Sequence, residues 1–236
     1  MTGMKMKGAR APFTAGVVAT LWIATASGLC AEPVPPSVAN LPAPGSYSLN
    51  RIQRVPEAQL LDADGKPAQL ASFTRGAVTA LGFFYGHCAD PAGCPVAWSA
   101  FESLRREASS DPLLMNKLRL IFVSIDPAHD TPATMRLLQK AESGADATIP
   151  WTFLTSSSED DLAPLLREMG QDISFETDAD GKRTGVVNHM LKVFLIDPNG
   201  WVREIYTTAF LAPENLLNDA RTLAIVHSEA NNRGAP

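Results

Sequence analysis

Residues 77–108 read AVTALGFFYGHCADPAGCPVAWSAFESLRREA, and this stretch decides the fold class. Its first nine residues form a nearly continuous apolar run, which is typical of a strand buried on both faces of a sheet. Two cysteines follow in a short loop. Pro95 then opens an amphipathic segment, and proline favours the first helical position because its missing N–H is not needed there. The stretch therefore predicts a strand, a cysteine loop and a helix in that order.

Strand and helix patterns alternate through the rest of the chain. Further strands are predicted at 118–125, 151–154, 186–196 and 201–208. Further helices are predicted at 131–141, 161–169 and 213–227. A hairpin over 58–70 is expected to turn at Asp64-Gly65, and a polar loop is expected at 176–185. This order predicts an α/β sandwich in which helices flank a central mixed sheet, with the strand, cysteine loop and helix arranged as in thioredoxin-like proteins.

The N-terminal region differs from the rest in charge and hydropathy. Residues 1–31 combine a basic start with an uncharged apolar run, which predicts a secretory signal or, alternatively, an uncleaved membrane anchor. Residues 32–46 carry five prolines and are expected to form an extended spacer. A single domain at 47–227 and a polar tail at 228–236 complete the chain. We therefore expect the domain to function outside the cytoplasm.

The charge of the chain limits its partners. The formal net charge is −5 over 236 residues. Residues 1–31 hold Lys5, Lys7 and Arg10 and no acid, so 17 of the 20 basic residues remain against all 25 acidic ones, a net charge of −8. An acidic domain offers no electrostatic footprint for phosphate backbones, which argues against nucleic-acid binding.

Cys88 and Cys94 remain once the leader, with Cys30, is set aside. In an oxidising compartment such a pair can form a structural disulfide. Closing so short a loop stabilises a protein by only about 2–3 kcal/mol, and a domain of this length builds an adequate core without it. The pair is therefore expected to perform chemistry, either dithiol–disulfide exchange or the binding of a soft ion such as Cu(I).

The position of each cysteine suggests reactive sulfurs. Cys94 immediately precedes Pro95, so its sulfur is expected at a helix N-terminus, where free N–H groups and the helix dipole stabilise a thiolate. Cys88 is expected at the carboxyl end of the buried strand, the edge at which α/β sheets usually place their sites. Two neighbouring thiolates would form a soft, chelating site.

A nitrogen ligand would turn two thiolates into a trigonal copper site, and the chain has four histidines. His227 and His129 are expected to be solvated. His87 can tune the pKa of Cys88, but adjacent side chains diverge on an extended backbone, which argues against joint ligation. His189 precedes an apolar strand and follows a polar loop that can carry it over the cysteines. A structural role for a histidine at the start of a strand remains the alternative.

Three ordered segments resemble the Sco/SenC family of membrane-associated copper chaperones: GFFYGHCADPAGCP (82–95), VSIDPAHDTP (123–132) and NHMLKVFLIDPNG (188–200). The resemblance implies a thioredoxin-like fold and a role in cytochrome c oxidase assembly. It also implies copper, as Cu(I) or alternatively Cu(II), bound by the thiolates of Cys88 and Cys94 and the imidazole of His189. The implied recipient is a membrane oxidase subunit or another copper carrier, and the implied location is the periplasm or the outer face of the inner membrane.

The chain departs from the family pattern at the site itself. The family places three residues between its cysteines, whereas five residues, Ala89 to Gly93, lie between them here. The longer loop raises the question of whether both sulfurs can meet His189 with the family geometry. Met190 stands where the family more often has serine and is expected to pack in the core. Asp126 resembles a family aspartate near the metal loop, and a strand-end turn residue is the alternative.

Three other functions remain as alternatives to a non-enzymatic metal carrier. A thiol–disulfide oxidoreductase would use Cys88 and Cys94 on partner cysteines, but its usual spacing is two residues, and Leu191 stands where such proteins set a proline. A peroxidase would need an arginine that the cysteine loop lacks. The third alternative is a binding module in which Cys88 and Cys94 form a structural disulfide bond.

Overall fold

The computed structural model describes residues 41–143 and 148–234. The predicted leader and most of the proline-rich spacer lie outside these ranges. None of the helices formed by the described residues is long and apolar enough to cross a lipid bilayer.

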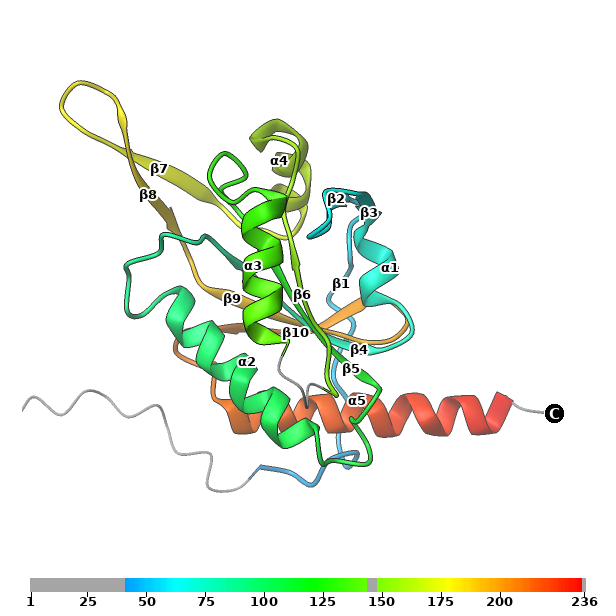
Figure 1. Cartoon of the computed structure of the whole chain (residues 1–236). Helices are drawn as coiled ribbons and strands as arrows, with labels where there is room; N and C mark the ends of the chain where they lie inside the picture. Colours follow the sequence, from blue (N-terminus) through cyan, green and yellow to red (C-terminus); the bar gives the residue numbers. More distant parts are fainter. Residues whose placement is uncertain (1–40, 144–147, 235–236) are drawn as a thin grey trace, which may run out of the picture. The chain divides into compact units, whose positions relative to one another are not determined.

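The domain is built on a six-stranded mixed sheet (Figure 1) with the order β1-β10-β9-β4-β5-β6. The strands are β1 (Gln53–Arg54), β4 (Val78–Phe84), β5 (Leu118–Ser124), β6 (Trp151–Leu154), β9 (Lys192–Ile196) and β10 (Trp201–Thr207). β4, β5 and β6 are parallel, whereas β9, β10 and β1 add antiparallel pairs on the other side of β4. Every residue of β4 is buried, which confirms the predicted central strand.

Helices flank this sheet, as the strand–helix alternation predicted. They are α1 (Leu70–Thr74), α2 (Cys94–Ala108), α3 (Pro132–Glu142), α4 (Glu159–Glu168) and α5 (Pro213–Gly234). α2 and α5 pack against each other and both contact β4, while α3 packs against β6. α2 begins at Cys94 with Pro95 in its first turn, so the predicted start of this helix is confirmed.

Local sequence signals account for several of the element ends. β2 (Gln59–Leu61) and β3 (Pro67–Gln69) form the predicted hairpin, and Gly65 adopts a φ of +76° in its turn, a conformation that glycine tolerates without a Cβ clash. Ser158 caps α4 by accepting a hydrogen bond from the backbone N–H of Asp161.

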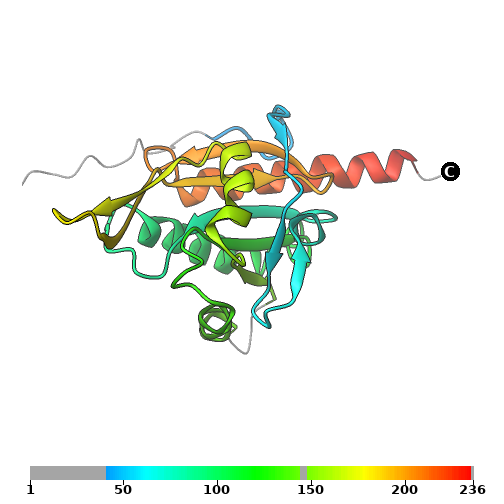
Figure 2. The same cartoon turned by 90° about the horizontal axis from the view of Figure 1, so that it is seen from above.

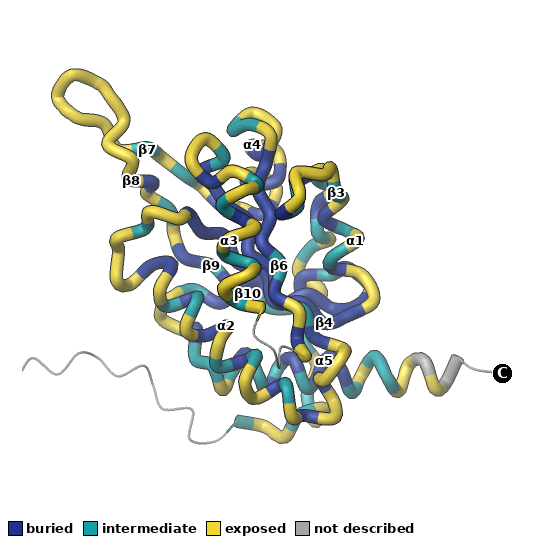
Figure 3. The backbone as a smooth tube through the Cα atoms, viewed as in Figure 1, coloured by how far each residue is buried: buried dark blue, intermediate teal, exposed yellow. Residues whose placement is uncertain are grey.

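The segment predicted as one strand at 186–196 is two strands in two sheets. β8 (Arg183–His189) pairs with β7 (Ile173–Thr177) in a separate antiparallel hairpin, and β9 begins only at Lys192. The polar loop expected at 176–185 is therefore wrong, because these residues form the arms and the turn of that hairpin. The hairpin projects from the sheet (Figure 2) and its tip is exposed (Figure 3). Ile173, Phe175 and Val187 pack against the core, but the polar turn between the two strands dominates the sequence pattern of this segment.

The last helix is longer than predicted. α5 continues to Gly234, beyond the predicted end near His227. No glycine or proline interrupts residues 214–233, so the chain carries no stop signal before Gly234.

Candidate metal centre

Cys88 lies in the loop between β4 and α2, Cys94 is the first residue of α2, and both are free thiols. Cys94 is only 6% exposed, whereas Cys88 is partly exposed. The two side chains are close enough for a hydrogen bond between them to affect the pKa of Cys94. The structure therefore brings the two predicted sulfurs together despite the five-residue spacing.

The expectation of a stabilised Cys94 thiolate is wrong. Burial raises the pKa of Cys94 to about 12, and the neighbouring Cys88 thiol adds to the increase. Hydrogen bonds from the backbone of Tyr85, just after β4, and of Cys94, at the N-terminus of α2, oppose this increase but are outweighed. Loss of hydration disfavours the charged sulfur more than these dipoles favour it. Cys94 is therefore a protonated thiol at neutral pH.

Tyr85, at the end of β4, connects the thiols to the histidine. Its ring centroid lies 6.0 Å from that of His189 with an interplanar angle of 71°. Burial raises the pKa of Tyr85 to about 12, and a hydrogen bond with Cys88 contributes to the increase, whereas a backbone contact from Val187 opposes it. The phenol is thus neutral and lies between the two halves of the candidate site. The sequence analysis did not single out Tyr85, although a polar ring at the end of a buried strand was a usable signal.

His189 is the last residue of β8, so the hairpin delivers it to the sheet edge. Burial lowers the pKa of His189, while the backbone of Met190 and the charge of Asp90 oppose this decrease. Its Nδ1 lies 3.3 Å from Nε2 of Gln171. A neutral imidazole is the form that binds metals, because protonation would occupy the lone pair.

Gln171 contacts His189, although no motif in the sequence marks it. It is 2% exposed, and its Nε2 donates a hydrogen bond to the carbonyl oxygen of Met190 at 2.9 Å. Its Oε1 is buried without a hydrogen-bond partner. An isolated glutamine in a loop carries no motif, and its contact with His189 exists because β7, which begins two residues later, pairs with β8 so that Ile173 lies opposite His189.

Tyr85 interacts with both Cys88 and His189, but the three predicted ligands do not form a closed site. Within residues 41–143 and 148–234, no group of three His, Cys, Asp or Glu side chains converges closely enough to hold a metal ion. Cys88 and Cys94 meet each other, and His189 meets Tyr85 and Gln171. A three-ligand site therefore requires a movement of the cysteine loop or of the hairpin end.

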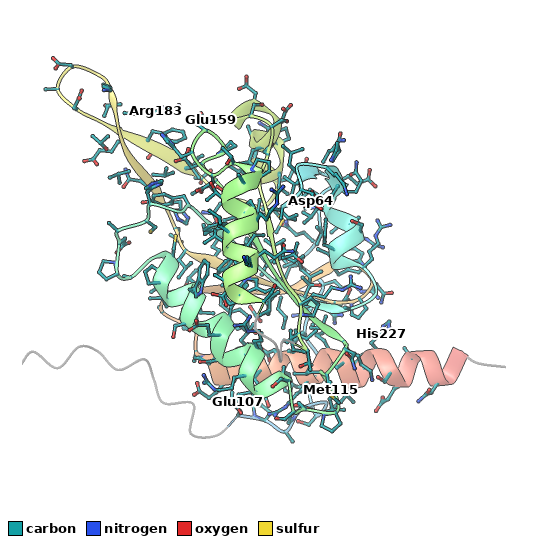
Figure 4. All side chains as sticks on the ribbon, viewed as in Figure 1. Asp64, Glu107, Met115, Glu159, Arg183 and His227 are labelled. Carbon is teal, nitrogen blue, oxygen red and sulfur yellow. The ribbon has the colours of Figure 1, made fainter. Side chains whose placement is uncertain are left out.

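The tip end of the hairpin, where β8 begins, is held to α4 by an ion pair. Nη2 of Arg183 donates to Oε2 of Glu159 at 3.0 Å (Figure 4), and the Arg183 guanidinium lies 3.6 Å from the centroid of the Phe175 ring. The hydrogen bond from Arg183 lowers the pKa of Glu159. Because β8 ends at His189, this anchor also restricts the element that carries the predicted ligand.

Met190 does not pack in the core, so that expectation is wrong. Its side chain is 60% exposed, and the following Leu191 is buried in its place. The chain leaves the hairpin here before entering β9, and only one of these two apolar side chains faces inward.

The two other histidines near the loop lie against each other. The ring centroids of His87 and His129 are 6.1 Å apart. His129 was expected to be solvated, and its side chain is 61% exposed, but its Nδ1 lies 2.8 Å from Oδ2 of Asp126. Asp126 is buried at the end of β5. Its carboxylate faces His129, and its expected place beside the metal loop stays a prediction.

Known proteins provide an independent comparison. The family model described as SCO1/SenC matches residues 50–224. Similar solved structures include the copper-bound ScoI of Bradyrhizobium japonicum, which is 22% identical with a TM-score of 0.57, covering 72% of this chain and 99% of that one. A SCO1/SenC family lipoprotein from Bacillus anthracis is 21% identical with a TM-score of 0.60, covering 75% and 99%.

A third similar structure is that of BsSco, a member of the Sco family of cytochrome c oxidase assembly proteins in which a disulfide switch was identified. It is 20% identical with a TM-score of 0.55, covering 75% of this chain and 98% of that one. A search of curated proteins found no match. At these identities the structural likeness establishes the fold, and it confirms the predicted thioredoxin-like sandwich.

Proposed function

The chain belongs to the SCO1/SenC family, and from this premise we propose that it is a copper carrier in which the thiolates of Cys88 and Cys94 and the imidazole of His189 hold the metal. Its cargo is Cu(I), with Cu(II) as the alternative state. The copper-bound ScoI structure supports copper as the cargo. The assignment of BsSco to oxidase assembly supports delivery to a membrane oxidase subunit or another copper carrier.

The observation that carries this proposal is the chemistry of the groups gathered around Tyr85. Two neighbouring thiols and a neutral imidazole are soft or borderline donors, which suit Cu(I). The buried Cys94 retains its proton in the metal-free domain, so copper has to displace that proton on binding. His189 releases no proton when it binds copper, because its lowered pKa keeps the imidazole neutral.

The exposure of the two sulfurs and the contact with Tyr85 indicate what each residue does when copper is captured and released. Cys88 is the accessible sulfur and is the first thiol that an incoming copper complex, or a partner's ligand, can reach. Cys94 lies deeper and closes the chelate. Tyr85 orients the Cys88 sulfur through its hydroxyl group. Copper then passes to a partner by ligand exchange. No covalent bond of an organic substrate has to be made or broken in this transfer.

The location is part of the same proposal. The leader at 1–31 would direct the domain to the periplasm or hold it at the outer face of the inner membrane, with the spacer at 32–46 separating it from the bilayer. The lipoprotein from Bacillus anthracis, a relative with a membrane attachment, supports this placement.

A second candidate function is thiol–disulfide exchange with partner cysteines. The neighbouring free thiols of Cys88 and Cys94 favour it. The buried, protonated Cys94 argues against it, because the thiolate is the form that attacks disulfides. We therefore rank this function second.

The test is a Cu(I) competition titration of the reduced protein beside two variants, His189→Ala and the matched control His227→Ala on α5. We expect one tightly bound copper per chain, an affinity at least about tenfold lower for His189→Ala and an unchanged affinity for the control. Equal affinities for the wild type and His189→Ala would remove His189 from the site. If no form binds copper tightly, the carrier is excluded and disulfide reductase activity becomes the function to assay.

A further inference from the structure

Two histidines remain unused by the proposed copper site, and the fold places them together. His87 follows β4 and His129 follows β5, and these parallel strands end side by side at Phe84 and Ser124. Both imidazoles are exposed at this edge, with ring centroids 6.1 Å apart and ring planes at 73°. The carboxyl edge of a parallel sheet is the usual position of a binding site in α/β proteins.

His129 is oriented by a buried carboxylate. Its Nδ1 lies 2.8 Å from Oδ2 of Asp126, whose side chain is almost fully buried and whose own N–H donates to Oγ of Ser124 at 3.1 Å. A carboxylate partner places the proton of a neutral imidazole on Nδ1 and leaves Nε2 as a free lone pair. This is the arrangement by which carboxylates orient histidines that ligate metals.

A second buried carboxylate, that of Asp130, lies behind His87. Its Oδ2 accepts hydrogen bonds from the N–H of Gly86 at 2.9 Å and from Oγ of Ser124 at 2.6 Å. Its Oδ1 is buried without a partner and lies against Gly86, where an added Cβ would come within 2.6 Å of it. An unpaired buried carboxylate oxygen is unfavourable, and a cation held by the adjacent His87 would offset that cost.

From these contacts we propose that His87 and His129 form a second metal site, the bis-histidine site, which takes a borderline divalent ion and prefers Cu(II). Ring nitrogens at about 2.0–2.1 Å from a metal hold two imidazole centroids roughly 5–6.5 Å apart, and the observed separation falls in this range. Cu(II) binds nitrogen ligands more strongly than the other common divalent ions of its row. Water completes the coordination sphere, because no third ligating side chain converges here within the described part of the chain.

The bis-histidine site lies next to the thiols, since His87 directly precedes Cys88. A two-ligand, water-completed site is weaker and more labile than a chelate of two thiolates and an imidazole. Such a site captures Cu(II) from solution and passes it, without a change of oxidation state, to the neighbouring thiolate and imidazole ligands, which then hold it in the Cu(II) state given above as the alternative cargo. This role as a loading position rests on the proposed function, whereas the existence of the site does not.

The test isolates the site from all thiols. Cu(II) is titrated into the full-length chain, kept in detergent, in which Cys30, Cys88 and Cys94 are replaced by serine, and electron paramagnetic resonance counts the bound nitrogens. We expect one Cu(II) per chain with two imidazole nitrogens. His87→Gln and His129→Gln, both at exposed positions, should each weaken binding at least tenfold and remove one nitrogen from the spectrum. The matched control His227→Gln should change neither quantity, and His189→Gln tests whether the bound Cu(II) uses the proposed copper site instead.

Asp126→Asn provides a second readout. It preserves the size of the side chain but no longer fixes the Nδ1–H form of His129, so we expect Cu(II) binding to weaken about three- to tenfold. Circular dichroism on the same sample shows whether the variant is folded. Cu(II) binding that is unaffected by both His87→Gln and His129→Gln, or that depends on His189, would overturn the proposal. The Cu(I) titration uses the protein with its cysteines intact, whereas the Cu(II) titration uses the serine variant. Failure of the bis-histidine site can therefore be distinguished from failure of the copper carrier.

Discussion

The side-chain amide nitrogen of Gln171 lies 3.3 Å from Nδ1 of His189 and 2.9 Å from the carbonyl oxygen of Met190. One buried amide therefore contacts both the imidazole and the backbone just after it. A donor facing Nδ1 leaves the proton of the neutral ring on Nε2. Neither ring nitrogen can then bind copper without changing this arrangement, because Nδ1 is engaged and Nε2 is protonated.

The first prediction follows from this contact. Gln171→Leu removes the donor and its unpaired Oε1 together, so the free energy of unfolding should change by less than about 1 kcal/mol. His189 no longer has to leave a hydrogen bond of about 1 kcal/mol, and Cu(I) affinity should rise about fivefold in a competition titration. Weaker binding by the variant would show that Gln171 presents His189 to the metal instead of restraining it.

The second prediction concerns the reactivity of the thiols. The pKa of about 12 for Cys94 leaves only about one thiolate in ten thousand near pH 8, and its sulfur is buried. Iodoacetamide should therefore modify Cys88 well before Cys94 in the folded, reduced, metal-free protein. Mass spectrometry of peptides at successive times measures both rates. In denaturant the difference should vanish, and comparable rates in the native protein would contradict the burial of Cys94.

The third prediction is a loss of stability in alkali. The pKa of Cys94 in the folded protein, about 12, lies above its ordinary value of 9.0, so the folded state holds this proton more tightly than the unfolded state. The resulting stabilisation is fully present below about pH 9 and is lost as the pH rises toward 12. Tyr47 and Tyr85, each raised to about 12 from 10.0, add to the loss at higher pH.

Urea unfolding over this pH range checks the prediction. Cys94→Ala lacks the thiol, so its stability should fall less steeply than that of the wild type just above pH 9, where the tyrosines do not yet contribute. Parallel curves for the two proteins would show that Cys94 does not titrate as its burial requires.

The fourth prediction tests the packing beneath the site. A Cβ at Gly82 in β4 would lie 2.6 Å from Cε1 of Phe122, which is completely buried beside Phe101. Gly82→Ala should therefore destabilise the domain by about 1–3 kcal/mol through overpacking. Gly76→Ala makes a useful comparison: no atom lies within 4 Å of its added Cβ, so any loss there comes from its positive φ. Thermal unfolding of the two variants separates steric overpacking from backbone strain.

Sequence patterns predicted the central sheet and its helices well, because these elements bury apolar side chains with clear periodicity. β4 and β5 were visible as apolar runs, and the start of α2 was marked by Pro95. The β7–β8 hairpin was missed because its polar turn and the exposed start of β8 outweigh the short alternation of Ile173 and Phe175 with polar residues in β7.

The candidate site was predictable only in part. Cys88, Cys94 and His189 were identifiable from residue type and order. The protonated state of Cys94 was not, because it depends on burial by residues distant in the sequence. The same holds for Gln171, which meets His189 only in the folded chain.

The central position of β4 affects the environment of the thiols while the chain is folding. β4 pairs with β5 but also with β9, where Leu81 faces Phe194 across more than a hundred residues of chain. Contacts so distant in sequence form slowly, because a long loop must close before they stabilise the fold. Until β9 pairs with β4, the core that buries Cys94 is incomplete. We therefore expect the thiol of Cys94 to be more open to oxidation while the chain folds than it is in the folded domain.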